Sequence, residues 1–345
     1  MINSFSPASR AIIVSAALVI VIAGMKYAAP LLVPFLLAAF IAIICFPLMS
    51  LLQQKGLPKG LSLVLVMLLV VFICLALVYL IGSTATDFSL SLPEYEQRIT
   101  TEWDAVTLWL NDHGISVTDS LKTIMDPAAA VGLVSSILMG FGGLLTNSFL
   151  IILTVVFILM EAAGYTQKLA VSNNAVEKHS QPDEPGFFHV FLGKLRSYMG
   201  MKTLISMLTG VVIGIAMWLI GVDYPVLWGV LVFFLNFVPN IGSIIAAVPA
   251  VILALLQLGF GSALLVTAVF VVVNVVIGNV IEPRFMGKGL GLSTLVVFVS
   301  LVFWGWVLGP VGMLLSVPLT ITVKLALDSK PETQRLGKLL GSVDN

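Results

Sequence analysis

The stretch LWGVLVFFLNFVPNIGSIIAAVPAVILALLQ, residues 227–257, decides the fold of this chain. It is almost wholly apolar, yet it contains the turn-forming run PNIGS at 239–243. A helix rises about 1.5 Å per residue and about 20 residues cross a bilayer, so the stretch is too long for one crossing and too short for two. Proline removes a helical hydrogen bond, and we therefore expect the helix to break at Pro239. The stretch predicts a helical hairpin over 225–258 that enters the membrane and returns to its starting side.

A second stretch, STLVVFVSLVFWGWVLGPVGMLLSVPLTITV at 293–323, repeats this design with a break expected at GPVG, residues 309–312. Lipid cannot hydrogen-bond the backbone groups that a break frees, so both tips are expected to face protein or a water-filled cavity. A transport site would be built there. The tips share a weak pattern, in which a proline and a glycine precede a Val-Pro pair: Pro239, Gly242 and Val248-Pro249 in the first, and Pro310, Gly312 and Val317-Pro318 in the second.

Composition places the chain among membrane proteins. It is 59% hydrophobic and 10% charged, with a mean hydropathy of +1.11, far from the values of soluble globular proteins. The net charge of zero gives no indication of nucleic-acid binding. Cys45 and Cys74 lie inside apolar runs, which argues against a disulfide framework. No nucleophile–base pattern, phosphate loop or metal-ligand spacing is found, so we expect no enzyme activity, no catalytic residue, no metal and no cofactor.

The remaining apolar runs predict about six full transmembrane helices beside the two hairpins, in an all-α polytopic membrane protein. The runs lie at about 11–29, 30–52, 61–83, 128–161, 201–221 and 262–281. The expected segments are three scaffold helices (1–83), an acidic amphipathic segment outside the membrane (84–130), a fourth transmembrane helix (131–161), a linker with a separate interfacial helix (162–199), a transport unit (200–323) and a tail (324–345).

Two short motifs mark expected helix starts. Ser91 and Glu94 have the spacing of a capping box for the amphipathic helix. Asp126 and Pro127 are expected to cap and open the fourth transmembrane helix.

Basic residues set the expected orientation. The positive-inside rule places both termini in the cytoplasm and the acidic 84–130 segment outside. The same rule requires 293–323 to turn back, because basic residues flank it on both sides. A helix followed by a hairpin from outside, and then a helix followed by a hairpin from inside, predicts an inverted repeat. The residues assigned to the cytoplasm are Arg10, Lys55, Lys59, Lys168, Lys178, Lys194, Arg196, Lys202, Arg284, Lys288, Lys324, Lys330, Arg335 and Lys338.

The candidate transport site consists of small polar side chains and turn residues at the two tips. The polar candidates are expected to hydrogen-bond a solute, or alternatively to cap broken helix ends and join helices. The set comprises Asn236, Pro239, Asn240, Gly242, Ser243, Asn274, Gly309, Pro310, Gly312 and Ser316. Asn274, Gly278 and Glu282 are expected on one helix face.

Glu282 and Arg284 are the candidates for coupling or gating. A dehydrated carboxylate at the inner membrane boundary is a plausible proton or cation site. The alternative is a structural ion pair of Glu282 with Arg284 or Lys288.

Two motifs resemble those of the autoinducer-2 exporter family. They are PNIGS at 239–243 and GNVIEPRFMGKGLGLSTLVVFVSLVFWGWVLGPVGMLLSVPLT at 278–320, and the similar layout extends over most of the chain. The resemblance implies export of the signalling molecule autoinducer-2 in quorum sensing, a homo-oligomer, expected to be a pentamer, and an elevator-like moving part. Some members of this family are described as sodium or lithium/proton antiporters.

We therefore expect a secondary transporter for a small, uncharged, hydroxyl-rich solute in the lipid bilayer. Transport would be coupled to a proton or sodium gradient, or it would proceed by facilitated diffusion without coupling. A sodium/proton antiporter and a membrane scaffold that transports nothing are the alternative interpretations.

Overall fold

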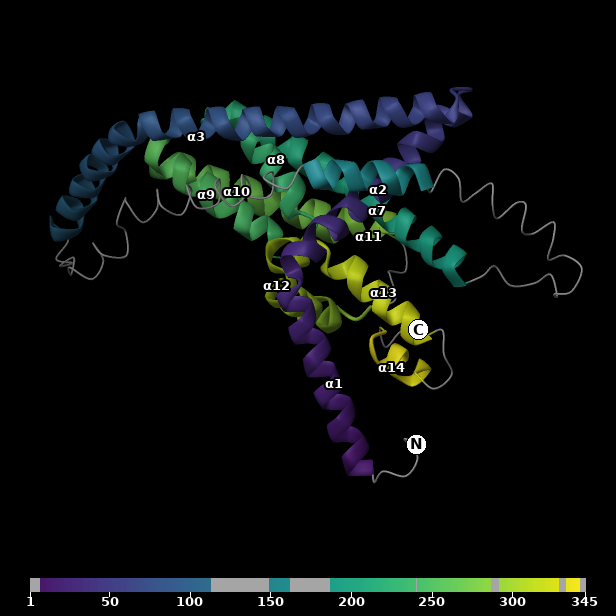
Figure 1. The fold of residues 1–345 in the computed structure, drawn as a ribbon. Helices are drawn as coiled ribbons and strands as arrows, with labels where there is room; N and C mark the ends of the chain where they lie inside the picture. Colours follow the sequence, from purple (N-terminus) through teal and green to yellow (C-terminus); the bar gives the residue numbers. More distant parts are fainter. Residues whose placement is uncertain are drawn as a thin grey trace, which may run out of the picture. The chain divides into compact units, whose positions relative to one another are not determined.

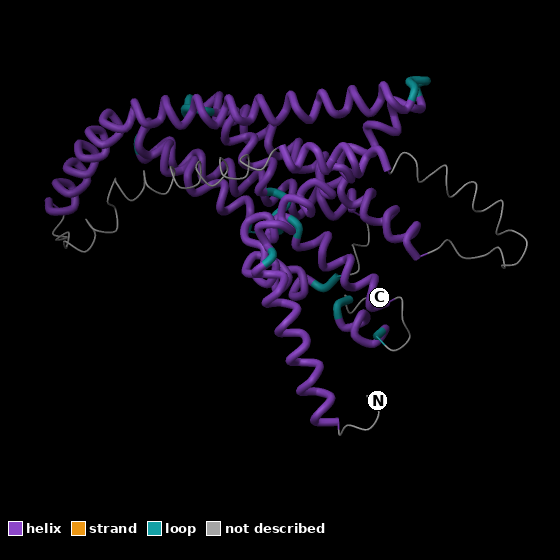
Figure 2. Tube along the Cα trace, in the orientation of Figure 1, coloured by secondary structure: helices purple, strands orange, loops and turns teal. Residues whose placement is uncertain are grey.

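The computed structural model describes residues 7–112, 149–161, 187–239, 241–286, 292–328 and 333–341. These residues form helices joined by short connections, and they contain no strand (Figures 1 and 2). The predicted all-α class is confirmed. The helices are α1 (Pro7–Tyr27), α2 (Ala29–Gln54), α3 (Lys59–Asp112), α7 (Phe187–Ile220), α8 (Pro225–Leu235), α9 (Gly242–Leu258), α10 (Phe260–Val276), the π-helix η2 (Ile277–Ile281), α11 (Glu282–Met286), α12 (Thr294–Leu314), α13 (Ser316–Asp328) and α14 (Gln334–Leu339), together with helical residues Phe149–Glu161.

Five of the described helices are long and apolar enough to cross a membrane, which confirms a polytopic membrane protein. Shorter apolar helices cover Ile12–Tyr27, Phe149–Glu161, Pro225–Leu235 and Gly242–Leu258. The five long ones are Ala29–Gln54, Lys59–Phe88, Leu195–Ile220, Phe260–Arg284 and Thr294–Leu314.

The chain divides into two compact units that interleave along the sequence. The first unit combines Met1–Leu51, Leu150–Arg196 and Leu290–Asn345. The second unit combines Leu52–Phe149 and Ser197–Gly289. The hairpin of α8 and α9 belongs to the second unit, and the hairpin of α12 and α13 belongs to the first.

Two predicted helix boundaries are wrong. α3 is one helix of 54 residues, so no helix begins at the Ser91–Glu94 motif. α7 is one helix of 34 residues, so the expected interfacial helix and fifth transmembrane helix are continuous. The polarity of the side chains changes along both helices, but the backbone stays helical: α3 continues through Pro93, and a single glycine such as Gly200 in α7 costs only about 1 kcal/mol. Three expected features lie outside the described residues. They are the helix start at Asp126 and Pro127, the part of the acidic segment at 113–130, and the linker at 162–186.

The first hairpin breaks within residues 236–241. α8 begins at Pro225, where a missing N–H is tolerated, and it ends at Leu235. Short turn bonds follow, from Val238 N to Leu235 O at 2.8 Å and from Ile241 N to Pro239 O at 2.6 Å. Gly242 then opens α9 against the end of α8, since a Cβ added to it would lie 1.8 Å from Leu235 O. The chain can reverse in so few residues because Gly242 has no side chain.

The open end of this hairpin is closed by Gln257 on α9. Its Oε1 accepts a hydrogen bond from Asp223 N at 2.8 Å, and its Nε2 donates to Gly221 O at 3.1 Å. Trp228 Nε1 donates to Asp223 O at 2.8 Å. The loop that leads from α7 into α8 is therefore tied to the last turn of α9.

Small residues let the helices of the second unit approach closely. Ala246, Ala250 and Ala254 are fully buried at four-residue spacing on α9, which packs against α8 and α10. α7 and α8 meet at Gly210 and Gly229, where an added Cβ on either would lie 2.5–2.7 Å from the carbonyl oxygen of the other. Inside a bilayer, helices associate through such packing because lipid tails provide little hydrophobic driving force.

The second hairpin turns at Gly309, whose φ of 70° and ψ of −153° interrupt α12. This backbone conformation is one that glycine adopts without steric cost. Gly312 follows against the preceding arm, where an added Cβ would lie 2.0 Å from Trp304 O. Trp304 Nε1 donates to Thr320 Oγ1 at 3.1 Å, which joins α12 to α13. The two tips therefore share a glycine seated on a carbonyl of the opposite arm.

Two cation–π contacts hold other parts of the first unit. Lys26 Nζ lies 3.9 Å from the centroid of the Trp306 ring, and joins α1 to α12. Arg196 Cζ lies 3.5 Å from the centroid of the Phe46 ring on α2. Such contacts contribute about 0.5–2 kcal/mol, with the larger values where water is excluded.

Gly242→Ala and Gly312→Ala should each lower the stability of the protein by about 1–3 kcal/mol, because the added methyl group collides with backbone that cannot move freely. The measurement is thermal unfolding of detergent-solubilised protein. Gly261→Ala is the control, since nothing lies within 4 Å of the added Cβ there. Equal melting temperatures for all three variants would contradict the close approach at the tips.

Candidate functional site

A stripe of polar side chains lies along one face of α7. Lys202, Ser206 and Thr209 are buried, and their spacing of four and three residues places them on one side of the helix. Buried polar groups in a membrane protein are costly unless they find partners or line a cavity. The stripe is therefore where function is expected in the second unit.

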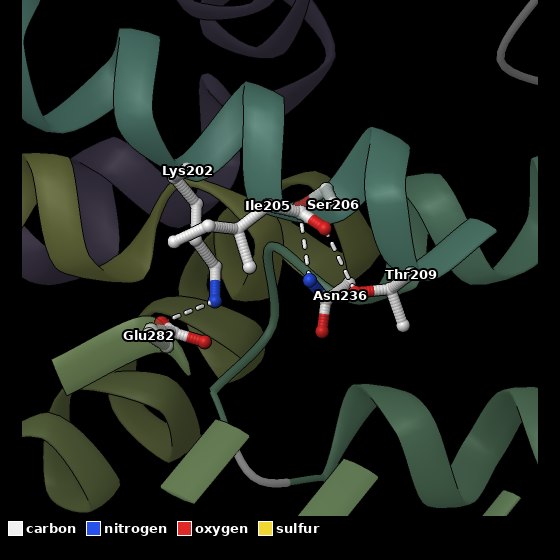
Figure 3. A network of polar contacts seen from close by, with 6 residues as sticks. All are labelled: Lys202, Ile205, Ser206, Thr209, Asn236 and Glu282. Atoms are coloured by element: carbon white, nitrogen blue, oxygen red, sulfur yellow. Dashed lines mark hydrogen bonds and ion pairs between the residues drawn. The ribbon is translucent and has the colours of Figure 1, made fainter. Parts of the chain in front are cut away.

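The first hairpin tip contacts this stripe through Asn236. Asn236 Nδ2 donates a hydrogen bond to Ser206 Oγ at 3.0 Å, and Figure 3 shows the carboxamide oxygen directed away from α7. One turn further along α7, Thr209 Oγ1 donates to Ile205 O of its own helix at 2.8 Å. Asn236 is the residue that follows α8, so the break in the helix places this amide at the stripe. The contact is neutral on both sides.

The charged end of the stripe is an ion pair. Lys202 Nζ lies 2.6 Å from Glu282 Oε1, and the two side chains are 5% and 24% exposed (Figure 3). Lys202 and Ser206 lie on successive turns of α7, so the ion pair and the Asn236 amide contact the same face of this helix. Breaking such a pair leaves a charge in a medium of low dielectric constant. The expected pairing of Glu282 with Arg284 is corrected, because Lys202, 80 positions earlier, is its partner among the described residues. Lys288 lies outside the described residues.

Glu282 is placed by the π-helix η2. Its backbone N–H donates to Ile277 O, five residues back, in place of the four-residue bond of an α-helix. The wider turn takes one extra residue and rotates every later side chain about the helix axis. Asn274, Gly278 and Glu282 therefore do not continue one α-helical face as predicted: Asn274 and Glu282 are half-buried and Gly278 is exposed. Single π turns inside α-helices occur frequently at functional sites.

The other candidates of the second unit occupy separate positions. Pro239 and Ser243 are half-buried at the tip, and Gly242 is buried there. Arg284 is exposed on α11. Asn240 lies outside the described residues.

The candidates of the first unit surround the second tip. Pro310 is exposed after the turn at Gly309, and Gly312 is buried. Ser316 begins α13 and is fully buried, and its Oγ has no hydrogen-bond partner among the described residues. An unsatisfied buried hydroxyl keeps its hydrogen-bonding capacity for a water molecule or a solute.

An apolar groove of about 560 Å³ lies between α3, α7 and α8. Its lining includes Leu77, Met207, Trp218 and Phe233. This groove offers no polar partner and does not suit a hydroxyl-rich solute. The polar stripe of α7, in contrast, offers polar side chains that can hydrogen-bond such a solute.

The sequence analysis did not place the three polar residues of this stripe in the candidate site. It counted Lys202 only as a marker of orientation and did not consider Ser206 or Thr209. Their spacing, K-x-x-x-S-x-x-T at 202–209, was the available signal, because three polar residues recur at helical period in an apolar run.

Glu282→Gln should destabilise the protein by about 3–5 kcal/mol, because it leaves the Lys202 ammonium buried without a counter-charge. Lys202→Gln combined with Glu282→Gln should recover much of this loss, and the coupling energy follows from a double-mutant cycle of melting temperatures. Lys324→Gln is the matched control. Its pair with Asp328, at 3.0 Å and with side chains 19% and 28% exposed, should contribute about 1 kcal/mol or less. Additive effects of the two substitutions at 202 and 282 would show that the pair is not coupled.

Comparison with known proteins shows to which family this chain belongs. Residues 16–332 match the model of the AI-2E family transporters. The chain is 42% identical over 339 residues to a Haemophilus influenzae protein that carries a provisional name as a transport protein without a stated substrate, covering 97% of each chain. It is 39% identical over 337 residues to the AI-2 transport protein TqsA of Escherichia coli, covering 97% of this chain and 96% of the relative.

A further Escherichia coli relative, YhhT, is 36% identical over 329 residues, covering 94% of this chain and 92% of the relative, and also bears a provisional transport name. These matches extend over almost the whole chain, and they agree with the multi-pass helical fold and with a transporter instead of an enzyme. The chain belongs to the AI-2E family of membrane transport proteins.

Proposed function

We propose that this protein exports a small, uncharged, hydroxyl-rich solute, and that the solute is autoinducer-2. The observation that carries the proposal is the contact between Asn236 and Ser206. An amide and a hydroxyl at a hairpin tip can exchange their mutual hydrogen bond for bonds to solute hydroxyls at little net cost, because such exchanges balance donors and acceptors. The neighbouring charges, Lys202 and Glu282, neutralise each other and leave no net charge to attract an ion.

Element lengths support a re-entrant path for the first hairpin. α8 has 11 residues and is about 16 Å long, roughly half the thickness of a bilayer core. Ser206 lies 14 residues before Ile220 at the end of α7, a rise of about 21 Å. A hairpin whose base lies at one membrane surface would therefore place Asn236 inside the bilayer. In the second hairpin, α12 extends about 22 Å from Thr294 to the turn at Gly309.

The name of TqsA supports the choice of solute. TqsA is named as an AI-2 transport protein and is 39% identical to this chain over nearly its full length. The pattern of basic residues supports a bacterial inner membrane location with both termini in the cytoplasm. We further propose that the protein forms a homo-oligomer and that its N-terminal helices form the scaffold. Export of the solute would give the protein a role in quorum sensing.

A sodium/proton antiporter is the second candidate, and Glu282 favours it. The carboxylate ends a π turn and is one-quarter exposed, so a cation can reach it if Lys202 moves away. Such exchange would depend on the charge of Glu282, whereas solute export would depend on the amide of Asn236.

Asn236→Ala should reduce the efflux of labelled autoinducer-2 from proteoliposomes at least tenfold, because the solute loses its hydrogen-bond partner at the tip. Efflux is followed with and without an imposed proton gradient. Thr267→Val is the control. Its hydroxyl donates at 2.8 Å to Ala263 O of its own helix, and its removal should leave efflux unchanged.

A parallel recording of internal pH during a sodium pulse separates the two candidates. Solute efflux that is lost with Asn236→Ala and gives no sodium-driven pH change supports the exporter. A sodium-driven pH change without solute movement, abolished by Glu282→Gln, would assign the protein to the antiporters. Wild-type efflux in well-folded Asn236→Ala protein would remove the tip from the transport site.

A further inference from the structure

The positive charge next to the Glu282 carboxylate is a side chain of the protein itself. Lys202 Nζ lies 2.6 Å from the carboxylate, and its side chain is only 5% exposed. A partly buried carboxylate is stabilised by a nearby positive charge, supplied by an ion, a proton or a basic side chain. Here a lysine from another helix supplies it.

The placement of the carboxylate supports a specific role for the pair. η2 ends at Ile281, directly before Glu282, and without its extra residue the side chain at position 282 would point about 100° away around the helix axis. Lys202 lies on the buried stripe of α7, one turn from the Ser206 hydroxyl that binds Asn236. A costly helix irregularity on one side and a buried ammonium on the other therefore converge beside the solute contact.

Among the residues that the structure describes, the surroundings of the pair are otherwise neutral or exposed. Tyr198, one turn before Lys202 on α7, is buried and interacts electrostatically with Glu282. Arg284, two residues after Glu282, is exposed. Lys202 is therefore the group best placed to compete with an external cation for the carboxylate.

We propose that Lys202 occupies a built-in cation site at Glu282, where its ammonium and an external alkali cation such as sodium or lithium exclude each other. Removal of the ammonium would convert Glu282 into a sodium-binding residue. The chain would then carry its own counter-ion, and solute movement would need no obligatory sodium. This inference rests on the proposed function, since it concerns how the charge at the transport site is neutralised.

The test measures stability, which reports on cation binding without any transport. Melting temperatures of full-length protein in detergent are compared in 100 mM sodium chloride and 100 mM choline chloride. Lys202→Gln and Lys202→Met should each gain a sodium-dependent increase of about 2–4 °C, because a bound ion stabilises the folded state. Wild-type protein should show no such increase, and lithium should act as sodium does.

Two control variants locate the effect. Lys202→Gln with Glu282→Gln should lose the sodium response, because the carboxylate is absent. Lys324→Gln removes a lysine from the half-buried pair with Asp328, which lies outside the candidate site, and should not gain a response. If a neutral variant at 202 is too unstable to melt, the readout is the amount recovered as a monodisperse peak after extraction in sodium against choline, and sodium should raise it.

The outcomes separate this inference from the proposed function. No sodium effect in either neutral variant, or an equal effect in the double variant, would overturn the built-in cation site and leave autoinducer-2 efflux by the wild type untouched. Absence of autoinducer-2 efflux, with a sodium response confined to the neutral variants, would overturn the proposed substrate and support the cation site.

Discussion

A polar group inside a bilayer must find its partner within the protein, and the described structure depends on this constraint. Breaking a helix exposes backbone groups and turn side chains that lipid cannot satisfy. The first hairpin meets the constraint with short turn bonds at its tip and with the hydrogen bond of Asn236 to Ser206. The second meets it with a glycine turn and the bond between Trp304 and Thr320. Each tip thus combines buried apolar side chains, such as Phe237 and Val311, with a few specific hydrogen bonds.

The same constraint links the neutral and the charged parts of the candidate site. Lys202 and Ser206 are one turn apart on α7, and their partners, Glu282 and Asn236, come from different helices of the second unit. A movement of the hairpin relative to α7 would disturb the amide contact directly and would alter the surroundings of the ion pair. The contact proposed to bind solute and the ion pair are therefore neighbours on one helix, which gives a physical route by which one can influence the other.

The internal ion pair also bears on how members of one family can differ in what they transport. A carboxylate neutralised by a lysine does not need a sodium ion, whereas the same carboxylate without the lysine does. Under the proposed built-in cation site, the lysine at position 202 alone decides whether Glu282 accepts an external cation.

The sequence by itself determined the membrane class, the family, and the places where the two long apolar stretches break. These follow from local rules: apolar length sets a crossing, and proline with glycine ends a helix. It did not determine that 59–112 and 187–220 are each one helix, because polarity changes the surroundings of a helix without stopping its hydrogen bonds. Only the tertiary structure identified Lys202 as the partner of Glu282. The 80 positions between them carry no local signal of contact, and the π turn that aims Glu282 at α7 is a one-residue shift invisible to a periodic pattern.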